Sequence, residues 1–241
     1  MAPAGYGARV EGVHAVTAAV EAGRVIRLTV ESRRRDRPEV ARLIDRVSDV
    51  RFVDDTRTLA DSEAPQGLIA ECSPIVPIEI DSLAVDGASV LVLDHLEDPQ
   101  NVGAIARSAA AAGCTGLVIS GRRSAPLSAS AFKAAAGALE HLPVAIVGSI
   151  AEALQRLKSL DVWIVGLDGT ADTSLFGLSL LTEPVAIVIG AEGAGLSHLV
   201  SKRCDIRVAI PMAERAESLN ASVSAALAVF EIMRVRSKMP G

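Results

Sequence analysis

The sequence predicts an α/β protein in which a mainly parallel sheet is covered by helices on both faces. Half of the residues are hydrophobic but only 2% are aromatic, so Ala, Val, Leu and Ile dominate, as suits buried parallel strands. Apolar strands also alternate with helical segments along most of the chain, which is the pattern of a sheet with helices on both faces.

Composition and Pro/Gly punctuation divide the chain into four segments. Residues 1–10 are small and Gly-rich and predict a flexible tail. Residues 11–74 predict a small α/β domain, and the prolines and glycine within 74–87 mark residues 75–87 as a linker. Residues 88–238 carry the larger sheet.

In the small domain, helical spacing or strand alternation predicts each element in turn. Pro38 is expected to open a helix, because proline is tolerated in the first turn. The expected elements are helices at 13–20 and from residue 38, strands at 25–30, 50–53 and 66–70, and one helical turn at 56–60.

The larger domain is expected to contain six strands, at 89–93, 116–119, 144–147, 162–165, 185–189 and 205–210. Helices are expected at 102–112, 129–139, 150–160, 196–201 and 219–236. One face of the last helix is apolar and is expected to lie in the core; it comprises Val223, Ala226, Leu227, Phe230 and Met233.

Several function classes are disfavoured by what the sequence lacks. Cys72, Cys114 and Cys204 are far apart, which predicts reduced thiols in a cytoplasmic protein. The four histidines have no Cys or acidic companions at metal-ligand spacing, so no metal site is expected. No signal peptide or run of about 18 apolar residues is present, so no membrane association is expected. A Ser hydrolase elbow is absent, and no GxGxxG follows the first strand, which disfavours a dehydrogenase.

The first unusual motif is Asp98-Pro99-Gln100-Asn101-Val102-Gly103, at a strand-to-helix turn. Pro99 fixes the turn, and Asn101 is expected to cap the helix. Arg107 follows nearly two turns later on a helix of small apolar residues. A guanidinium there is costly unless it meets an anion or a partner, or unless Arg107 is simply a surface residue.

Two further motifs lie downstream. Residues 190–195 are Gly-rich but lack the Lys-Ser/Thr of a phosphate loop, and Glu192 would repel phosphate. This loop suits a neutral or cationic ligand, or it is simply a tight turn that needs positive φ angles. Ser218 and Asn220 are both good caps for the last helix. Upstream, the cluster Arg33, Arg34, Arg35 and Arg37 is either a phosphate-binding patch or a solvated loop.

Taken in this order, the three motifs resemble the signature of the SpoU (TrmH) family of RNA ribose 2′-O-methyltransferases, a branch of the SPOUT superfamily. The matching residues are Asp98-Pro99, Asn101, Gly103 and Arg107; Gly190-Ala191-Glu192-Gly193 and Gly195; and Ile210-Pro211-Met212 and Ser218 to Val223. Residues 12–16 and Gln66-Gly67 also resemble an L30e/L7Ae-type RNA-binding domain. The chain departs from the family pattern at Gln100, at Ala221, and at Glu214, Arg215 and Glu217, so the motifs by themselves do not fix the target nucleotide.

The resemblance implies a C-terminal sheet domain with a deep trefoil knot, a small N-terminal L30e-like domain that binds RNA, and a homodimer with a shared active site. It implies S-adenosylmethionine (AdoMet) as cofactor and RNA as partner, with a large-subunit ribosomal guanosine as the expected target. A tRNA or antibiotic-resistance 2′-O-methyltransferase, or a non-catalytic RNA-binding protein, stays open. The residues implied to contact AdoMet are Leu167, Gly190, Glu192, Gly195, Ile210, Met212, Ser218 and Leu219.

The resemblance also assigns roles in catalysis. Arg107, supplied across the dimer, is expected to bind the target phosphate and stabilise the developing alkoxide, since arginine loses its proton with great difficulty. Asn101 would position Arg107 or the ribose, and Glu192 would anchor one of those two side chains. Ser218 and Asn220 are expected near the ribose and the cofactor. The Arg33–Arg37 cluster and Arg107 are the expected RNA contacts.

Overall fold

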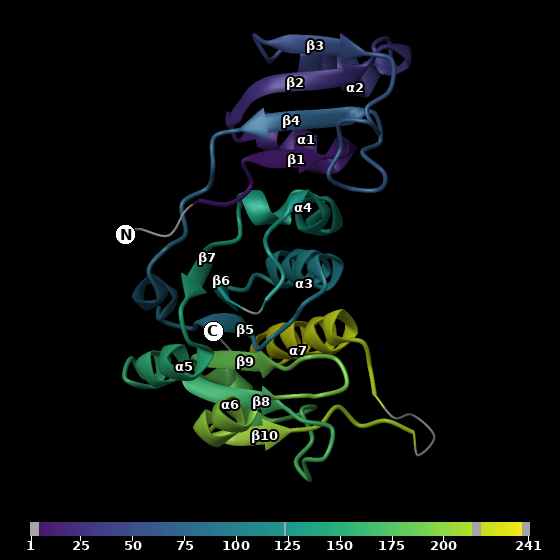
Figure 1. The fold of residues 1–241 in the computed structure, drawn as a ribbon. Coiled ribbons are helices and arrows are strands. Elements are labelled where there is room, and N and C mark those ends of the chain that lie inside the picture. The colour runs from purple at the N-terminus through teal and green to yellow at the C-terminus, as the bar shows by residue number, and fades with distance from the viewer. Residues whose placement is uncertain (1–4, 123, 214–217, 238–241) are drawn as a thin grey trace.

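The computed structural model describes residues 5–122, 124–213 and 218–237, and it contains two sheets (Figure 1). The smaller sheet has four strands in the order β1-β4-β2-β3, and the larger has six in the order β10-β8-β9-β5-β6-β7. Every neighbouring pair in the larger sheet is parallel. The predicted α/β class and parallel sheet are therefore confirmed.

The N-terminal elements form a small α/β unit with α1 and α2 behind the sheet in Figure 1. They are β1 (Arg9–Glu11), α1 (Val13–Glu21), β2 (Val25–Glu31), η1 (Ser32–Arg34), α2 (Pro38–Ile44), β3 (Val50–Val53) and β4 (Leu68–Cys72). The expected helical turn at 56–60 is not helical.

The expectation of a flexible tail at 1–10 is wrong for residues 5–10. β1 pairs with β4, and Tyr6 and Val10 are buried, because this segment adds an antiparallel edge strand and two side chains to the core. Residues 1–4 lie outside the described part.

The larger sheet consists of β5 (Ser89–Leu93), β6 (Gly116–Ser120), β7 (Val144–Val147), β8 (Trp163–Leu167), β9 (Val185–Ile189) and β10 (Ile206–Val208). The remaining elements are η2 (Ile80–Leu83), α3 (Pro99–Ala111), α4 (Ala129–Ala135), η3 (Ala138–Glu140), α5 (Ile150–Lys158), η4 (Ser179–Thr182), α6 (His198–Arg203) and α7 (Ala221–Arg236). Strand residues alternate between two cores. For example, Leu91 joins the core under α3 and α7, and Val92 joins the core under α5.

Two helix boundaries differ from expectation for local reasons. α3 begins at Pro99 because the Asp98 carboxylate accepts from the Gln100 N–H at 2.8 Å, so Asp98 is the cap and Asn101 lies inside the first turn. α4 ends at Ala135 because Ala136 and Gly137 have positive φ angles. A Cβ on Gly137 would stand 2.8 Å from that of Ala18, so the backbone turns where α1 approaches.

The prediction of which face of α7 lies in the core is wrong. Val223, Leu227, Phe230 and Met233 are 46%, 37%, 47% and 49% exposed. The opposite face is buried instead. Its apolar members are Ala221, Ala225, Ala228, Val229 and Ile232, and it also contains the buried Glu231. Both faces are apolar, so periodicity alone does not tell which one packs on the sheet.

The two sheets share one continuous core, and Phe132 of α4 is the largest fully buried side chain that the structure describes. Phe132 is fully buried, and its ring is 6.2 Å from that of Tyr6. A Cβ on Gly7 would lie 2.3 Å from the Phe132 ring, so only glycine allows this approach. Residues of both sheets therefore belong to one hydrophobic cluster rather than to two separate ones.

A buried ion pair reinforces this junction. Arg24 Nε and Nη2 donate to the two carboxylate oxygens of Glu140 at 2.6 and 2.5 Å, and Glu140 is fully buried. Arg24 also donates to the carbonyls of Gly7 and Ser73. The bidentate geometry fixes the turn after α1 against η3.

Removing the guanidinium should destabilise both parts together. We expect Arg24→Ala to lower the free energy of unfolding by about 3–5 kcal/mol, because it leaves the Glu140 carboxylate buried and unpaired. Urea unfolding followed by circular dichroism measures this. Arg27→Ala removes the exposed pair with Asp49 and should change little, so equal effects of the two variants would contradict the proposed importance of the junction.

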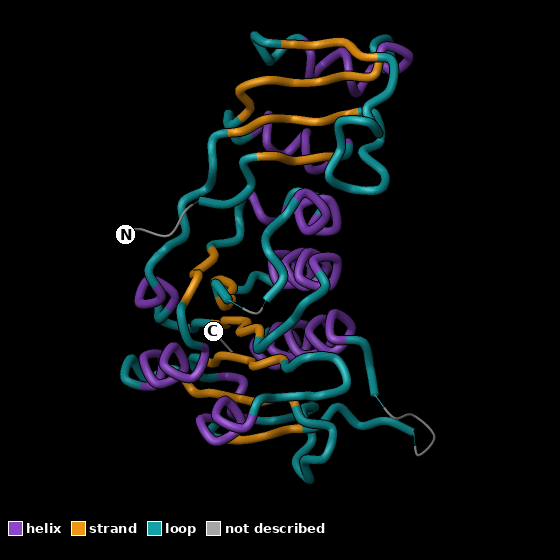
Figure 2. Tube along the Cα trace, in the orientation of Figure 1, coloured by secondary structure: helices purple, strands orange, loops and turns teal. Residues whose placement is uncertain are grey.

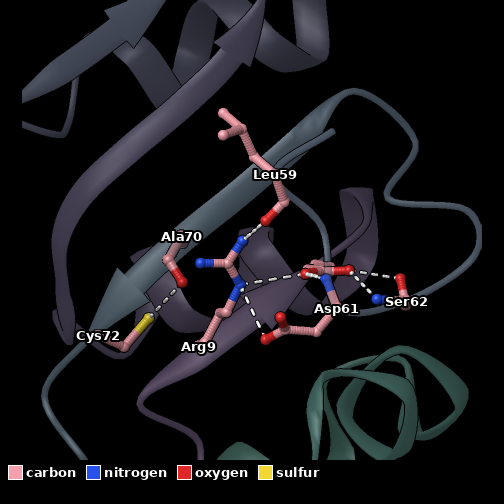
Figure 3. Close-up of polar contacts among 7 residues, drawn as sticks. Arg9, Leu59, Asp61, Ser62, Ala70 and Cys72 are labelled. Atoms are coloured by element: carbon pink, nitrogen blue, oxygen red, sulfur yellow. Dashed lines mark hydrogen bonds and ion pairs between the residues drawn. The ribbon is translucent and has the colours of Figure 1, made fainter. Parts of the chain in front are cut away.

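A second polar cluster holds the loop before β4 to the small sheet (Figure 3). The buried Glu11 carboxylate accepts from the N–H groups of Asp61 and Ser62 at 2.7 and 2.9 Å, from the Ser62 hydroxyl, and from Arg9 Nε at 3.2 Å. Arg9 also donates to the Leu59 carbonyl. Burial alone would raise the pKa of Glu11, but these hydrogen bonds outweigh burial and lower it.

This cluster should contribute stability that disappears in acid. A carboxyl group whose pKa is lowered by folding stabilises the folded protein fully at pH values above the ordinary glutamate pKa. This contribution is lost as the pH falls through the pKa of the group in the folded protein. We expect Glu11→Gln to cost about 1–3 kcal/mol at neutral pH, and the difference from wild type to shrink on acidification. Urea unfolding from neutral to acid pH tests this, with the exposed Glu21→Gln as control; a pH-independent difference would contradict it.

Candidate functional site

The polar motifs converge because parallel strands end at a common edge. The connections after β8, β9 and β10 leave the sheet on one side (Figure 2), and the loop after β5 leads to α3 at the same edge. In a parallel sheet this edge is where ligands bind.

A cavity of about 380 Å³ opens at this edge. Its walls combine apolar side chains and glycine backbone with five polar side chains, those of Asp168, Thr170, Glu192, Ser218 and Ser224. Every residue that the resemblance assigns to the cofactor lines it: Leu167, Gly190, Glu192, Gly195, Ile210, Met212, Ser218 and Leu219. The volume falls in the range of small-molecule sites.

The loop after β9 folds back on itself to form one wall. Ala191 and Gly195 exchange backbone hydrogen bonds of 3.1 and 2.8 Å, and Gly193 and Gly195 have φ angles of 78° and 67°. A Cβ on Gly190 would lie 2.1 Å from the Gly195 carbonyl carbon. The glycines therefore build a tight turn that brings main-chain atoms to the cavity and presents Glu192.

Asn101, Glu192 and Asn220 form one hydrogen-bonded cluster beside the cavity. Glu192 Oε1 accepts from Asn101 Nδ2 at 2.8 Å and from Asn220 Nδ2 at 2.7 Å, and Asn220 Nδ2 is also 3.1 Å from Asn101 Oδ1. Asn101 is only 8% exposed. The cluster joins the first turn of α3, the loop after β9 and the start of α7.

The last helix is capped by Asn220 rather than Ser218. Asn220 Oδ1 accepts from the Ser222 N–H at 2.8 Å and from the Ser222 hydroxyl at 2.6 Å. Ser218 instead lines the cavity. Asn220 therefore has two tasks, with its oxygen on the helix and its amide nitrogen on Glu192. Glu214, Arg215 and Glu217 lie outside the described residues.

Arg107 is not part of this cluster. It is exposed on α3, does not line the cavity, and makes no hydrogen bond or ion pair with any residue that the structure describes. Six residues separate it from Asn101, which corresponds to about 9 Å along a helix. Within a single chain, the guanidinium is unpartnered.

The arginine cluster is partly neutralised by local contacts. Arg33 pairs with Glu31 at 2.8 Å, and the Arg35 guanidinium lies 5.0 Å from the Phe52 ring centre. Arg33, Arg35 and Arg37 remain exposed, and Arg34 is half-buried. The cluster follows the end of β2, and β2 is parallel to β3. In Figure 1 the β3 arrow points to the same side as the arrows of β8, β9 and β10, so β2 ends on the same side as these strands.

Two polar features were missed by the sequence reasoning. Asp168 lines the cavity, and hydrogen bonds from Thr170 and Arg207 lower its pKa. The Asp168-Gly169-Thr170 turn directly after β8 was the available signal. His95 pairs with Asp94 at 2.6 Å, and their adjacency in the sequence was the signal there.

The described ranges contain no cluster of three metal-ligating side chains and no helix long and apolar enough to cross a membrane.

The family model of the SpoU rRNA methylases matches residues 88–230, which include all three motifs. The chain belongs to this family. It is therefore related to RNA methyltransferases, and its fold is theirs. YacO of Bacillus subtilis, a TrmH-family protein, is 40% identical over 178 residues, 71% of each chain. The match to the 23S rRNA (guanosine-2′-O-)-methyltransferase RlmB of Xylella fastidiosa is 45% identical over 150 residues, 62% of this chain and 60% of the relative.

Solved SpoU structures extend the similarity to both sheets. The SpoU methyltransferase AviRb from Streptomyces viridochromogenes, in complex with AdoMet, has a TM-score of 0.82 and 28% identity, over 96% of this chain and 91% of its own. The matching chain thus includes the N-terminal unit that the family model leaves out.

The two tasks of Asn220 can be separated by mutation. We expect Asn220→Ser to keep the cap but lose the Glu192 contact, so unfolding stability should be nearly unchanged while methyl transfer to RNA falls. Asn220→Ala should lose both and cost about 1 kcal/mol in addition.

Thermal unfolding and incorporation of labelled methyl groups measure these two properties. Ser149 caps α5 in the same way, so Ser149→Ala is a matched control that should lower stability and leave methyl transfer intact. If Asn220→Ser transferred methyl groups at the wild-type rate, the contact between Asn220 and Glu192 would be dispensable for the reaction.

Proposed function

We propose that this protein is an AdoMet-dependent methyltransferase that methylates the ribose 2′-hydroxyl of a guanosine in large-subunit ribosomal RNA. The observation that carries the proposal is the Asn101–Glu192–Asn220 cluster beside a cavity walled by backbone. The target class follows the activity for which the RlmB relative is named. The cytoplasm, where ribosomal RNA is accessible and the three free cysteines stay reduced, is the proposed location.

The cavity residues fit AdoMet by their chemistry. Apolar Leu167, Ile210 and Leu219 suit an adenine ring, and the Gly190 turn allows main-chain contact where a side chain would clash. When bound, AdoMet would supply a methyl group on a positively charged sulfur. Glu192 places a carboxylate in the wall of the cavity, which would favour a positively charged group, in agreement with the expectation that this loop disfavours phosphate.

The cluster would position the attacking ribose 2′-hydroxyl rather than remove its proton. Asn101 and Asn220 are fixed by Glu192, so their remaining polar atoms can orient a ribose without further loss of side-chain freedom. Ser218 adds a hydroxyl at the cavity rim. Arg107 would bind the target phosphate and stabilise charge that develops on the oxygen.

We further propose that Arg107 reaches this cluster from a second subunit. The exposed α7 stripe of Val223, Leu227, Phe230 and Met233 is the kind of apolar surface that subunit association buries. α3, which carries Arg107, packs against α7. An interface on α7 would therefore bring each unpartnered Arg107 close to the neighbouring subunit, as a homodimer with shared sites requires.

We propose the deep trefoil knot in the C-terminal domain, since α7 returns from edge strand β10 to pack on α3 and the central strands β5 and β9. The N-terminal unit is proposed to be L30e-like and to bind RNA through Arg33, Arg34, Arg35 and Arg37. Exposure of three of these arginines supports a phosphate-binding role.

Arg107 provides the test of the activity. Wild-type protein should transfer labelled methyl groups from AdoMet to large-subunit rRNA isolated from cells that lack the gene. Arg107→Ala should lower the rate by about 100- to 1,000-fold without weakening AdoMet binding, and Arg107→Lys should also fail because lysine lacks the planar fork. Arg156→Ala, which removes an exposed pair with Asp81, is the control.

A mixture of inactive variants tests the shared site. When Arg107→Ala and Asn101→Ala subunits are mixed and refolded together, one site of each mixed dimer regains both residues, so activity should reappear. Sedimentation establishes the oligomeric state. A monomeric protein, or a mixture as inactive as its components, would refute the shared site, and absence of any methyl transfer by wild type would refute the function.

A further inference from the structure

A second cavity, of about 350 Å³, adjoins the proposed AdoMet site. It shares Ala191 and Glu192 with the first cavity, and Asn101 of the polar cluster also lines it. The other lining residues are His95, Leu96, Glu97 and Asp98, which connect β5 to α3. A group bound here therefore touches the same cluster that is proposed to hold the ribose.

His95 is held in a single orientation. Its Nδ1 lies 2.6 Å from Oδ1 of the buried Asp94, and the other Asp94 oxygen accepts from the Ser197 N–H at 2.7 Å. Because a carboxylate only accepts, Nδ1 carries the hydrogen, and the neutral ring has its lone pair on Nε2. His95 also has a φ of 60°, a left-handed conformation that is unfavourable for a side chain with a Cβ.

Two of the acceptor side chains that line this cavity are not used by the polar cluster or by the cap of α3. The Asp98 carboxylate is used as the α3 cap, and Glu192 Oε1 is used by the two asparagines. The Glu97 carboxylate and His95 Nε2 make no hydrogen bond or ion pair within the described ranges. Three carboxylates in one small space disfavour phosphate, so a ligand here must bring hydrogen-bond donors rather than negative charge.

Among nucleobases, guanine presents adjacent donors, N1–H and the N2 amino group, on its Watson–Crick edge, and a carboxylate can accept both. We propose that the second cavity holds the base of the target guanosine, with Glu97 and His95 as base-binding residues and Asp94 as a positioning residue. This inference rests on the proposed function and deepens it. It gives the enzyme a means of selecting the nucleotide beside the reacting ribose.

The test uses full-length protein and a transcript that contains the mapped target nucleotide. That guanosine is replaced by inosine, which lacks the N2 amino group, or by adenosine. We expect wild type to lose about tenfold to a hundredfold in kcat/KM on each substituted transcript. Glu97→Gln should lose a similar factor on guanosine and should no longer distinguish guanosine from inosine.

His95→Gly separates binding from folding. Glycine adopts a positive φ without strain, so this variant should be as thermally stable as wild type or more so. It should nevertheless lose about tenfold or more in kcat/KM on the guanosine transcript while AdoMet affinity, measured by calorimetry, is unchanged. Asp94→Asn should show the same loss of guanosine discrimination, and its AdoMet affinity reports whether it is folded.

Matched controls are Glu152→Gln and His141→Gln, both exposed and remote from the cavity. Glu97→Gln and His95→Gly variants that behave like these controls on all three transcripts would overturn the inference. A methylated position that proves to be adenosine, cytidine or uridine would also overturn it. In the first case wild type still methylates the guanosine, so the proposed function would stand. In the second case the guanosine assignment of the proposed function would fall together with this inference, while the RNA methyltransferase activity would stand. A wild type without any methyl transfer would remove the function itself.

Discussion

A single carboxylate oxygen connects the three segments on which this site depends. Glu192 Oε1 accepts from two asparagines that are 119 residues apart in the chain. One asparagine belongs to the first turn of α3 and the other caps α7, so the loop after β9 cannot shift without releasing both helix starts. Hydrogen bonds of this kind are stronger where they are shielded from water, and Asn101 is buried. The backbone-walled cavity is therefore held in shape by side chains that also face the proposed ribose position.

The sheet supplies the geometry that makes this connection possible. β5, β9 and β8 are adjacent and parallel, so their following loops start within a few strand spacings of each other. α7 then has two apolar faces with different tasks. Its small residues pack closely on the sheet and on α3, while its larger residues remain exposed for the proposed subunit contact.

Much of this arrangement could be predicted from the sequence, and the failures have specific causes. All six strands of the larger sheet were predicted, because continuous apolar runs between turn residues are distinctive. The start of α3 was misplaced because Asp98 and Asn101 are both competent caps, and only the structure shows which side chain reaches a free N–H. The buried face of α7 was assigned wrongly because hydrophobicity does not distinguish a core from an interface. Arg107 could be recognised as unusual, but its missing partner is absent from a single chain. The Asp94-His95 pair is visible in the sequence, but the orientation of His95 depends on the burial of Asp94 and on a backbone angle that the sequence does not show.

The core around Phe132 has a consequence for how RNA would be chosen. Because α4 packs against β1 of the small sheet and against α3 of the larger domain, and the Arg24–Glu140 pair spans the junction, the arginine loop after β2 has a set separation from the proposed catalytic edge. A nucleic acid that touches both places must present them at that spacing. The enzyme would then select RNA by its three-dimensional shape. A short unstructured strand with the right base would bind at the proposed catalytic edge but could not reach the arginine loop at the same time.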